Sequence, residues 1–233
     1  MPGSEMVMSP RHFFALVNVP LWIGLLVTSC HHVADPPPPP IGVYPLNEAE
    51  LIGQLKTAYQ KRDYDTFKRL FHADYQFYLN QAQPDGTTHW GLSEELRIHR
   101  RMFRPHAVQP PESPVPQELW LVSVDITLTA FVAFQDATTY YFDPTTNPTG
   151  FRRENFTVSQ ADYAASVFFQ TQGETQYRLD GVENFVVVND LSKTAGDDGK
   201  FLIYRWEDLG ALALFANSTS TSTWTQVKSL YKW

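Results

Sequence analysis

The feature that most constrains the fold is a long alternation of apolar and polar side chains at residues 118–134, ELWLVSVDITLTAFVAF. Apolar residues occupy every even position from Trp120 to Phe134. After Glu118, the polar residues of the segment fall on odd positions: Ser123, Asp125, Thr127 and Thr129. Successive side chains of a β-strand point to opposite faces of a sheet, whereas a helix has a period of 3.6. The pattern predicts a long antiparallel strand with one face against a core and the other toward water or a polar lining.

Three more strand-like runs follow, at 163–170, 177–189 and 200–208. The breaks between them are rich in turn residues, Gly173 with Glu174 and then the segment DLSKTAGDDG. Gly181 lies inside the second of these runs, where a glycine indicates a β-bulge at which a long strand bends. The second half of the chain is therefore predicted to be a sheet.

The first half carries helix signals. Asn47 followed three residues later by Glu50 is a capping pair, which predicts a helix over about 48–61. Asp63 is expected to cap a second, shorter helix, and residues 75–79 alternate as a strand. Two helices therefore precede the first strand.

Ser93 is expected to cap a third helix, EELRIHRRMF. Its inward stripe would be Leu96, His99, Met102 and Phe103. A short amphipathic helix is expected near the end of the chain, because Trp224, Val227, Leu230 and Tyr231 have helical spacing. Helices followed by a run of strands predict an α+β fold, with a strongly curved antiparallel sheet of four to six strands and three N-terminal helices on its concave face.

The composition fits one globular domain with appendages. The chain has 233 residues, 43% of them hydrophobic and 14% aromatic, enough for an ample core. The formal net charge of −7 leaves no basic stripe for a phosphate backbone, so nucleic acid is excluded as a partner. One dense basic cluster stands out: Arg97, Arg100, Arg101 and Arg104. We interpret it as a solvated helix face rather than a binding patch.

The N-terminus has the three parts of a secretory signal peptide. Arg11 and His12 form a basic start, residues 13–27 are mainly apolar, and the small residues Thr28 and Ser29 follow. We therefore predict a signal peptide over 1–29 and expect the folded domain after it.

Val27, Thr28, Ser29 and Cys30 resemble the bacterial lipobox, an aliphatic residue and two small ones before an obligatory cysteine. The resemblance implies cleavage before Cys30, the only cysteine of the chain, and a diacylglycerol on its sulfur. Acyl chains would anchor the protein to a membrane. His31 differs from the aspartate that resembles an inner-membrane retention signal, which favours the outer membrane of a bacterial cell envelope, facing the periplasm. An ordinary signal peptide with a chance cysteine and an uncleaved N-terminal anchor remain open alternatives.

Residues 30–45 contain five consecutive prolines, Pro36 to Pro40. Such a run forms a semi-rigid polyproline II rod, so we interpret 30–45 as a lipid-anchored tether for a domain at 46–233. A binding site for a proline-recognising partner is the alternative interpretation.

The segment AYQKRDYDTFKRLFHADYQFYL resembles the opening of the nuclear transport factor 2-like superfamily, which includes ketosteroid isomerases, polyketide cyclases of the SnoaL type and scytalone dehydratases. The matching positions are Tyr59, Arg62, Asp63, Phe67, Leu70, Phe71, Asp74 and Phe77. The resemblance extends loosely over 46–209. It implies a cone, or cystatin-like roll, as a single domain with a pocket between sheet and helices, and a homodimer formed through the convex side of the sheet.

The side chains expected to face such a pocket are aromatic or lie at element edges: Tyr59, Tyr75, His99, Trp120, Arg205 and Trp206. Packing in a core is the alternative for each of them. Asp125, His99 and Glu207 could be nominated as acid–base groups, but none matches the catalytic spacing of the superfamily, so no catalytic residue is assigned. His72, Asp74 and His89 have a metal-like composition without a spacing that forces convergence, and no metal or cofactor is predicted.

Two hypotheses for the function follow. The first is a membrane-tethered, non-catalytic lipoprotein domain that binds a small apolar ligand or a partner protein. The alternative is an enzyme of the isomerase, cyclase or dehydratase type with an acid–base pocket inside the cone. A pocket filled by its own Trp and Phe side chains would favour the first hypothesis, and an open pocket with a buried carboxylate near a tyrosine would favour the second.

Overall fold

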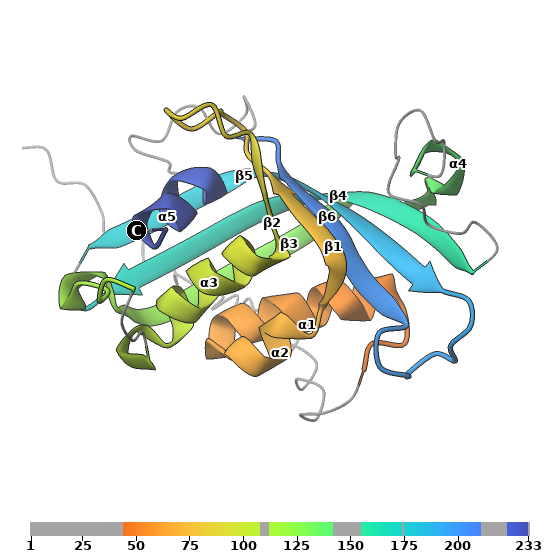
Figure 1. The fold of residues 1–233 in the computed structure, drawn as a ribbon, viewed down its shortest axis with the longest axis horizontal. Helices are drawn as coiled ribbons and strands as arrows, with labels where there is room; N and C mark the ends of the chain where they lie inside the picture. The colour runs from red at the N-terminus through yellow and green to blue at the C-terminus, as the bar shows by residue number, and fades with distance from the viewer. Residues whose placement is uncertain (1–43, 108–111, 142–154, 174, 211–222, 233) are drawn as a thin grey trace, which may run out of the picture. The chain divides into compact units, whose positions relative to one another are not determined.

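The computed structural model describes residues 44–107, 112–141, 155–173, 175–210 and 223–232 (Figure 1). The chain divides into two units, Met1–Pro36 and Pro37–Trp233, and every described residue belongs to the second. The predicted signal peptide, Cys30 and the proline run therefore lie outside the described residues. Within the described part of the chain, no helix is both long enough and apolar enough to cross a membrane.

Six strands form one curved sheet in the order β2-β1-β6-β5-β4-β3 (Figure 1). Their bounds are β1 Phe71–Tyr78, β2 His89–Gly91, β3 Leu121–Asp136, β4 Phe156–Thr171, β5 Gln176–Asp190 and β6 Phe201–Asp208. The helices are α1 Glu48–Lys61, α2 Tyr64–Lys68, α3 Leu92–Phe103, α4 Thr138–Tyr141 and α5 Trp224–Leu230, with 3₁₀ turns at Pro105–Ala107 and Gln117–Leu119. The predicted α+β class with a curved sheet is confirmed.

One pairing differs from the predicted antiparallel sheet, because β1 and β6 run parallel. The chain leaves β2 through α3, enters the sheet again at the far edge as β3, and returns through three antiparallel pairings to β6. The last strand of that meander thus reaches β1 in the same direction. The local sequence of either strand carries no signal for this direction.

The first two helices begin where the capping residues predicted. The Asn47 side chain accepts a hydrogen bond from the backbone of Glu50 at 2.9 Å, and Asp63 caps α2. The third helix differs, since it begins at Leu92 after an extended Gly91 that makes no side-chain capping bond. Ser93 therefore lies inside the helix instead of capping it.

The even positions of β3 do not all face the core. Val122 is 47% exposed beside a buried Leu121, where the register of the strand shifts. Val124 and Ile126 are buried, whereas Ala130 is exposed and Phe134 only partly buried. The alternation predicted the strand correctly but overestimated how far the core extends along it.

No bulge occurs at Gly181, because β4 and β5 pair in unbroken register on both sides of it. The backbone of Gly210 approaches this position, and a Cβ on residue 181 would lie 3.0 Å from the Gly210 carbonyl oxygen. The glycine is required for this close approach rather than for a bend.

The main core lies between one face of the sheet and the helices α1, α3 and α5 (Figure 1). It includes Leu55 of α1, Met102 of α3 and Trp224 of α5, together with Phe77 and Phe185 of the sheet. A smaller apolar cluster forms on the other face, from Ala137, Val158, Val186, Val188 and Tyr204. The sheet is therefore apolar on both faces over part of its length.

Candidate functional site

Four of the six side chains predicted to line a pocket are completely buried. Tyr59, Tyr75, His99 and Trp206 are 0–1% exposed, whereas Trp120 and Arg205 are partly exposed. Tyr59 of α1 lies at the centre, with the rings of Phe67, His99, Phe103, Trp206 and Trp224 at centroid distances of 5.0–6.3 Å. The structure brings Tyr59, His99 and Trp206 together as packed neighbours.

The other two predicted side chains lie elsewhere. The Trp120 indole donates a hydrogen bond to the Val115 carbonyl at 3.0 Å, which fixes the loop before β3. Arg205 lies on β6, forms an ion pair with Glu207 and stacks over the ring of Tyr78. Trp120 thus packs at the margin of the main core, whereas Arg205 takes no part in it.

A buried ion pair, Glu95 with Lys228, lies next to this cluster. The Lys228 ammonium of α5 is 2.7 Å from one carboxylate oxygen of Glu95 on α3, and both side chains are 0% exposed. The Trp90 indole donates to the other oxygen at 2.6 Å. Burial alone would raise the pKa of Glu95, but the charge of Lys228 and the hydrogen bonds from Lys228 and Trp90 hold that pKa below its ordinary value. The charged form of Glu95 is thus stabilised inside the core.

His99 connects the ion pair to Tyr59. Its Nδ1 is 2.9 Å from the Glu95 carbonyl oxygen, and its Nε2 is hydrogen-bonded to the Tyr59 hydroxyl. The carbonyl can only accept, so Nδ1 carries the proton and Nε2 accepts from the tyrosine. Burial lowers the pKa of His99 to about 4, against an opposing effect of Glu95. The imidazole is therefore neutral at pH 7, with both nitrogens bonded.

Two tyrosines complete the acid–base set. Burial and the charges of Glu95 and Glu183 raise the pKa of Tyr59 well above its ordinary value. Burial and the neighbouring Glu95 do the same for Tyr75 of β1. Both phenols are therefore neutral at physiological pH, and the Tyr59 hydroxyl donates to His99. Glu95, His99, Tyr59 and Tyr75 thus form the kind of set that acid–base catalysis requires.

A second buried carboxylate, Glu183, lies opposite Asp208 in the pairing of β5 with β6. It accepts a hydrogen bond from the Trp206 indole at 2.6 Å. Burial and the charge of Asp208 raise the pKa of Glu183 well above its ordinary value. Asp208 instead accepts bonds from the backbone and hydroxyl of Thr225 at 2.9 and 2.8 Å. A cavity of about 10 Å³ borders both carboxylates, which is room for about one water molecule.

Helix α5 closes this interior. The Trp224 ring lies 5.0 to 5.6 Å from the rings of Tyr59, Phe169 and Trp206. The Lys228 ammonium lies over the ring of Phe77, 3.3 Å from its centroid. The acid–base set is therefore covered by aromatic side chains and neutralised by a lysine, so no reactive group of it faces open space.

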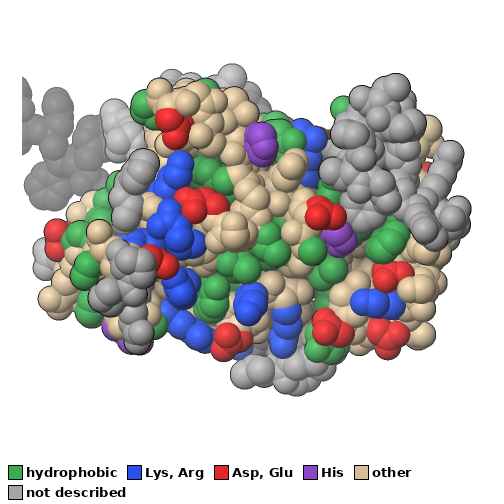
Figure 2. All heavy atoms as spheres, in the orientation of Figure 1, with side chains coloured by type: hydrophobic (Ala, Val, Ile, Leu, Met, Phe, Trp, Pro, Cys, Tyr) green, Lys and Arg blue, Asp and Glu red, His purple; other side chains and the backbone are tan. Residues whose placement is uncertain are grey.

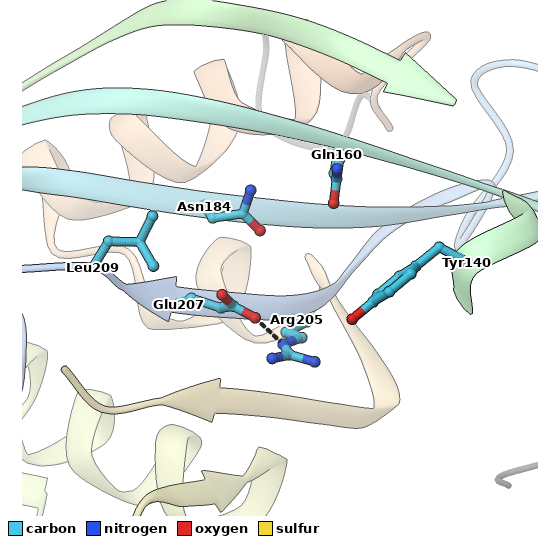
Figure 3. A pocket seen from close by; sticks show the side chains of 6 residues that line it. All are labelled: Tyr140, Gln160, Asn184, Arg205, Glu207 and Leu209. Atoms are coloured by element: carbon cyan, nitrogen blue, oxygen red, sulfur yellow. Dashed lines mark ion pairs between the residues drawn. The ribbon is translucent and has the colours of Figure 1, made fainter. Parts of the chain in front are cut away.

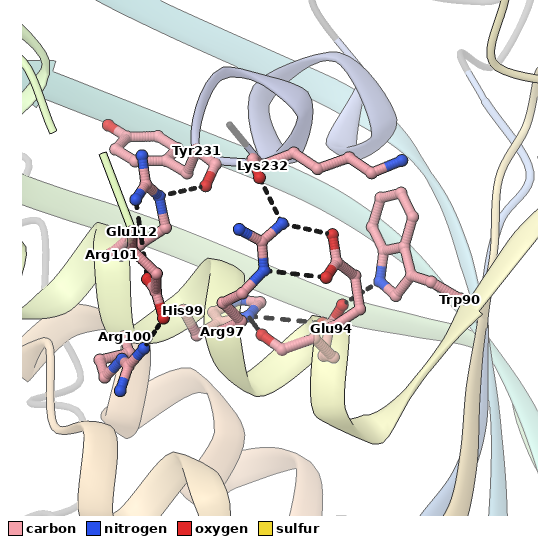
Figure 4. A network of polar contacts seen from close by, with 10 residues as sticks. Trp90, Glu94, Arg97, His99, Arg100, Arg101, Glu112, Tyr231 and Lys232 are labelled. Carbon is pink, nitrogen blue, oxygen red and sulfur yellow. Dashed lines mark hydrogen bonds and ion pairs between the residues drawn. The ribbon is translucent and has the colours of Figure 1, made fainter. Parts of the chain in front are cut away.

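The arginine cluster of α3 holds the C-terminal segment in place. Arg101 is 2% exposed and donates to the Tyr231 carbonyl oxygen at 2.6 Å (Figure 4). It also donates to the Ser113 carbonyl oxygen at 2.7 Å. Arg97 pairs with Glu94 at 2.8 Å and also donates to the Lys232 carbonyl. Figure 2 shows Lys and Arg side chains gathered with Asp and Glu between them on the side where Figure 1 draws α3 and α5. The interpretation as a solvated face is wrong for Arg101, because this guanidinium is enclosed between α3 and the C-terminal segment.

The described residues contain no group of three or more His, Cys, Asp and Glu side chains that could hold a metal ion. The side chains that the sequence interpretation missed are Glu95, Glu183, Lys228 and Trp224. A signal for two of them was available. Glu95 is four residues before His99, and Lys228 is four after Trp224, so each charged residue lies on the inward stripe of an amphipathic helix.

No family model and no curated protein matches this chain in sequence. Several solved structures are similar to it. The Δ5-3-ketosteroid isomerase from a Mycobacterium species has a TM-score of 0.41 at 13% identity, covering 69% of this chain and 89% of its own. A scytalone dehydratase-like protein from Novosphingobium aromaticivorans has a TM-score of 0.43 at 11% identity, covering 70% and 81%. A conserved protein from Planctomyces limnophilus has a TM-score of 0.42 at 12% identity, covering 68% and 89%.

Two of these neighbours, the isomerase and the dehydratase-like protein, are of kinds that the sequence resemblance also names. All three TM-scores lie below 0.5. The activities belong to those proteins, and the function of this chain has to be argued from its own side chains.

Proposed function

We propose that this chain is a membrane-tethered lipoprotein whose cone domain is non-catalytic and binds a ligand or a partner protein. The observation that carries the proposal is the filled interior. Tyr59, Trp206 and Trp224 pack against one another where a pocket was expected. The Glu95 carboxylate, which would have to serve as the general base, is already paired with Lys228. Binding is therefore assigned to the outside of the domain.

The proposal of a membrane tether rests on the lipobox-like residues 27–30 and on the proline run. Two or three acyl chains on Cys30 would hold the protein almost permanently to a bilayer, at about 0.8 kcal/mol for each buried methylene. The proposed location is the periplasmic face of the outer membrane. The proline run would then act as a spacer between the membrane and the domain.

Substitution of the cysteine tests the tether. The Cys30→Ser variant should move from the membrane fraction to the soluble fraction, because the thioether for the lipid is gone. Ser29→Ala keeps a small residue before the cysteine and is the matched control, which should stay with the membrane. Equal membrane retention of both variants on fractionation would disprove lipidation at this residue.

One observation favours an isomerase, cyclase or dehydratase instead. Hydrogen bonds connect three buried residues in series, Glu95, His99 and Tyr59. A β,γ-unsaturated ketone is a suitable probe, because proton transfer by a carboxylate converts it into a conjugated enone with strong ultraviolet absorbance. The detergent-purified full chain should convert this probe no faster than its Glu95→Gln variant. An acceleration that Glu95→Gln abolishes would favour the enzyme.

A further inference from the structure

A groove of about 380 Å³ lies on the sheet face opposite the main core. Its lining residues are Tyr140, Gln160, Asn184, Arg205, Glu207 and Leu209 (Figure 3). The alternation of side chains along β5 shows on which face of the sheet the groove lies. Phe185 is 0% exposed in the main core, so its neighbour Asn184 points to the other side. The groove is therefore separate from the Tyr59 cluster.

The register of the sheet places the polar side chains of the groove side by side. Asn184 of β5 is directly opposite Glu207 of β6. One rung away, Val186 pairs with Gln160 on one side and with Arg205 on the other. Three adjacent strands within the sheet thus supply two carboxamides, a guanidinium and a carboxylate from fixed positions. Sites on strands are held more rigidly than sites on loops.

Neighbouring contacts orient these groups. The Asn184 amide donates to the Asp162 carboxylate at 2.7 Å, which leaves its oxygen on the groove side (Figure 3). The Arg205 guanidinium lies 3.7 Å from the centroid of the Tyr78 ring and forms an ion pair with Glu207. A cation stacked on an aromatic face loses little freedom when it binds a ligand. The groove is therefore preorganised for hydrogen bonding.

The charged groups at the groove are paired. Among the described residues that line it, Arg205 and Glu207 are the charged ones and form an ion pair, and the Asp162 carboxylate beside it is bonded by Asn184. Glu207 would repel an anionic ligand and Arg205 would repel a cationic one. For either ligand, this repulsion offsets the attraction to the oppositely charged residue. The guanidinium, carboxylate and carboxamides alternate along the groove. They match a neutral ligand with many groups that both donate and accept hydrogen bonds.

A peptide strand is a weaker match than a saccharide. The backbone groups of β5 and β6 beneath the groove already pair with neighbouring strands, so they cannot bind an added strand. Recognition must come from side chains, as with the hydroxyl groups of a sugar. Tyr140 is 61% exposed and adds an aromatic side chain to the edge of the groove. We propose that this groove binds a neutral saccharide.

This inference deepens the proposed binding function by naming the ligand class. The two can fail separately. Absence of saccharide binding would leave the lipid tether and the closed interior intact, since neither depends on the outer face. Release of a ligand from the interior would refute the closed interior without touching the groove.

The test uses the detergent-purified full chain on an array of neutral oligosaccharides and of acidic ones that carry uronic acid or phosphate groups. We expect binding to neutral members. Titration calorimetry with the best neutral oligosaccharide should then show an affinity at least about tenfold lower for Arg205→Ala and for Glu207→Ala, since each variant leaves its charged partner unpaired.

The matched control is Arg178→Ala. Arg178 also lies on a strand and pairs with the residue two positions later, Asp180, at 2.6 Å, but it does not line the groove. This variant should bind as the unmodified chain does. Three results would overturn the proposal: binding to acidic oligosaccharides alone, no binding to any neutral member, or an equal loss in Arg178→Ala. A dimer in light scattering that Arg205→Ala dissociates, without saccharide binding, would assign the groove to a second copy of the chain instead.

Discussion

At the scale of single residues, Glu95 depends on its partners. The carboxylate is completely buried, and Lys228 and Trp90 bond both of its oxygens. Removal of one member of a buried pair leaves an uncompensated charge, which costs far more than the pair itself contributes. The stability of the domain should therefore respond asymmetrically to changes at these positions.

We predict that Lys228→Met lowers the free energy of unfolding by about 3–5 kcal/mol, because Glu95 stays buried and loses its counter-charge. The double variant Glu95→Gln with Lys228→Met should recover most of that loss. Urea unfolding followed by tryptophan fluorescence measures both, in the Cys30→Ser background. Arg104→Met, which breaks the exposed pair with Asp65, is the control and should cost less than about 1 kcal/mol. A cost this small for Lys228→Met as well would mean that the pair is not buried.

His99 predicts a pH dependence. Its pKa is about 4 in the folded chain because of burial, against about 6.5 when unfolded. Between these values the unfolded chain binds a proton that the folded chain does not. Stability should therefore fall as the pH decreases from 6.5 to 4, by about 3 kcal/mol from this residue alone.

The variant His99→Gln isolates that contribution, since glutamine can also donate to a carbonyl and accept from Tyr59 but does not titrate. Urea midpoints at pH 7 and pH 4.5 should differ less for the variant than for the unmodified chain. The same difference in both proteins would mean that His99 is already protonated in the fold or is exposed.

The sequence predicted some of these residues and missed others for a physical reason. Tyr59, His99 and Trp206 could be expected to point inward, because apolar and aromatic side chains reveal a buried stripe. Glu95 and Lys228 lie on equally buried stripes, but a charge is ordinarily a sign of exposure. Neither charge can be buried unless the other compensates it, and 133 residues separate the two in the chain. Pairs of this kind become visible only once α3 and α5 are packed together.

At the scale of elements, the packing of α5 keeps the interior closed. Its Trp224 fills the space between Tyr59, Phe169 and Trp206, and a capping box of Thr223 with Gln226 begins the helix. The rest of the helix is held by Lys228 and by Arg101, which binds the Tyr231 carbonyl. The helix thus acts as part of the core rather than as an appendage.

We predict that Trp224→Ala costs about 3–5 kcal/mol of unfolding free energy and leaves a cavity beside Tyr59. Indole should then bind that cavity and raise the unfolding midpoint of the variant only. Leu230→Ala changes the same helix at a side chain that is 39% exposed, and should cost less than about 1 kcal/mol without creating a binding site. Indole binding to the unmodified chain would contradict a filled interior.

Most elements could be predicted from local signals. The bounds of α1 follow from its cap at Asn47, and the long strands follow from their alternation. The parallel pairing of β1 with β6 and the role of Gly181 could not, because both depend on segments distant in sequence. Local patterns encode the period of an element, whereas its neighbours are set by packing.

At the scale of the whole molecule, two sheet faces have two different roles in this account. One face is closed by α1, α3 and α5 around a neutralised acid–base set, and the other carries the groove at Arg205 and Glu207. The resemblance to enzymes of the cone superfamily concerns the fold. The filling of the interior by Trp206 and Trp224 separates this chain from a domain with an open pocket.

The most direct test of this account is native mass spectrometry of the full chain, purified in detergent and then released from it. The closed interior predicts a mass equal to the processed chain with its lipid on Cys30 and nothing more. A stoichiometric apolar molecule that remains bound under native conditions, leaves on denaturation, and is lost in a Tyr59→Phe or Trp206→Phe variant would contradict the closed interior.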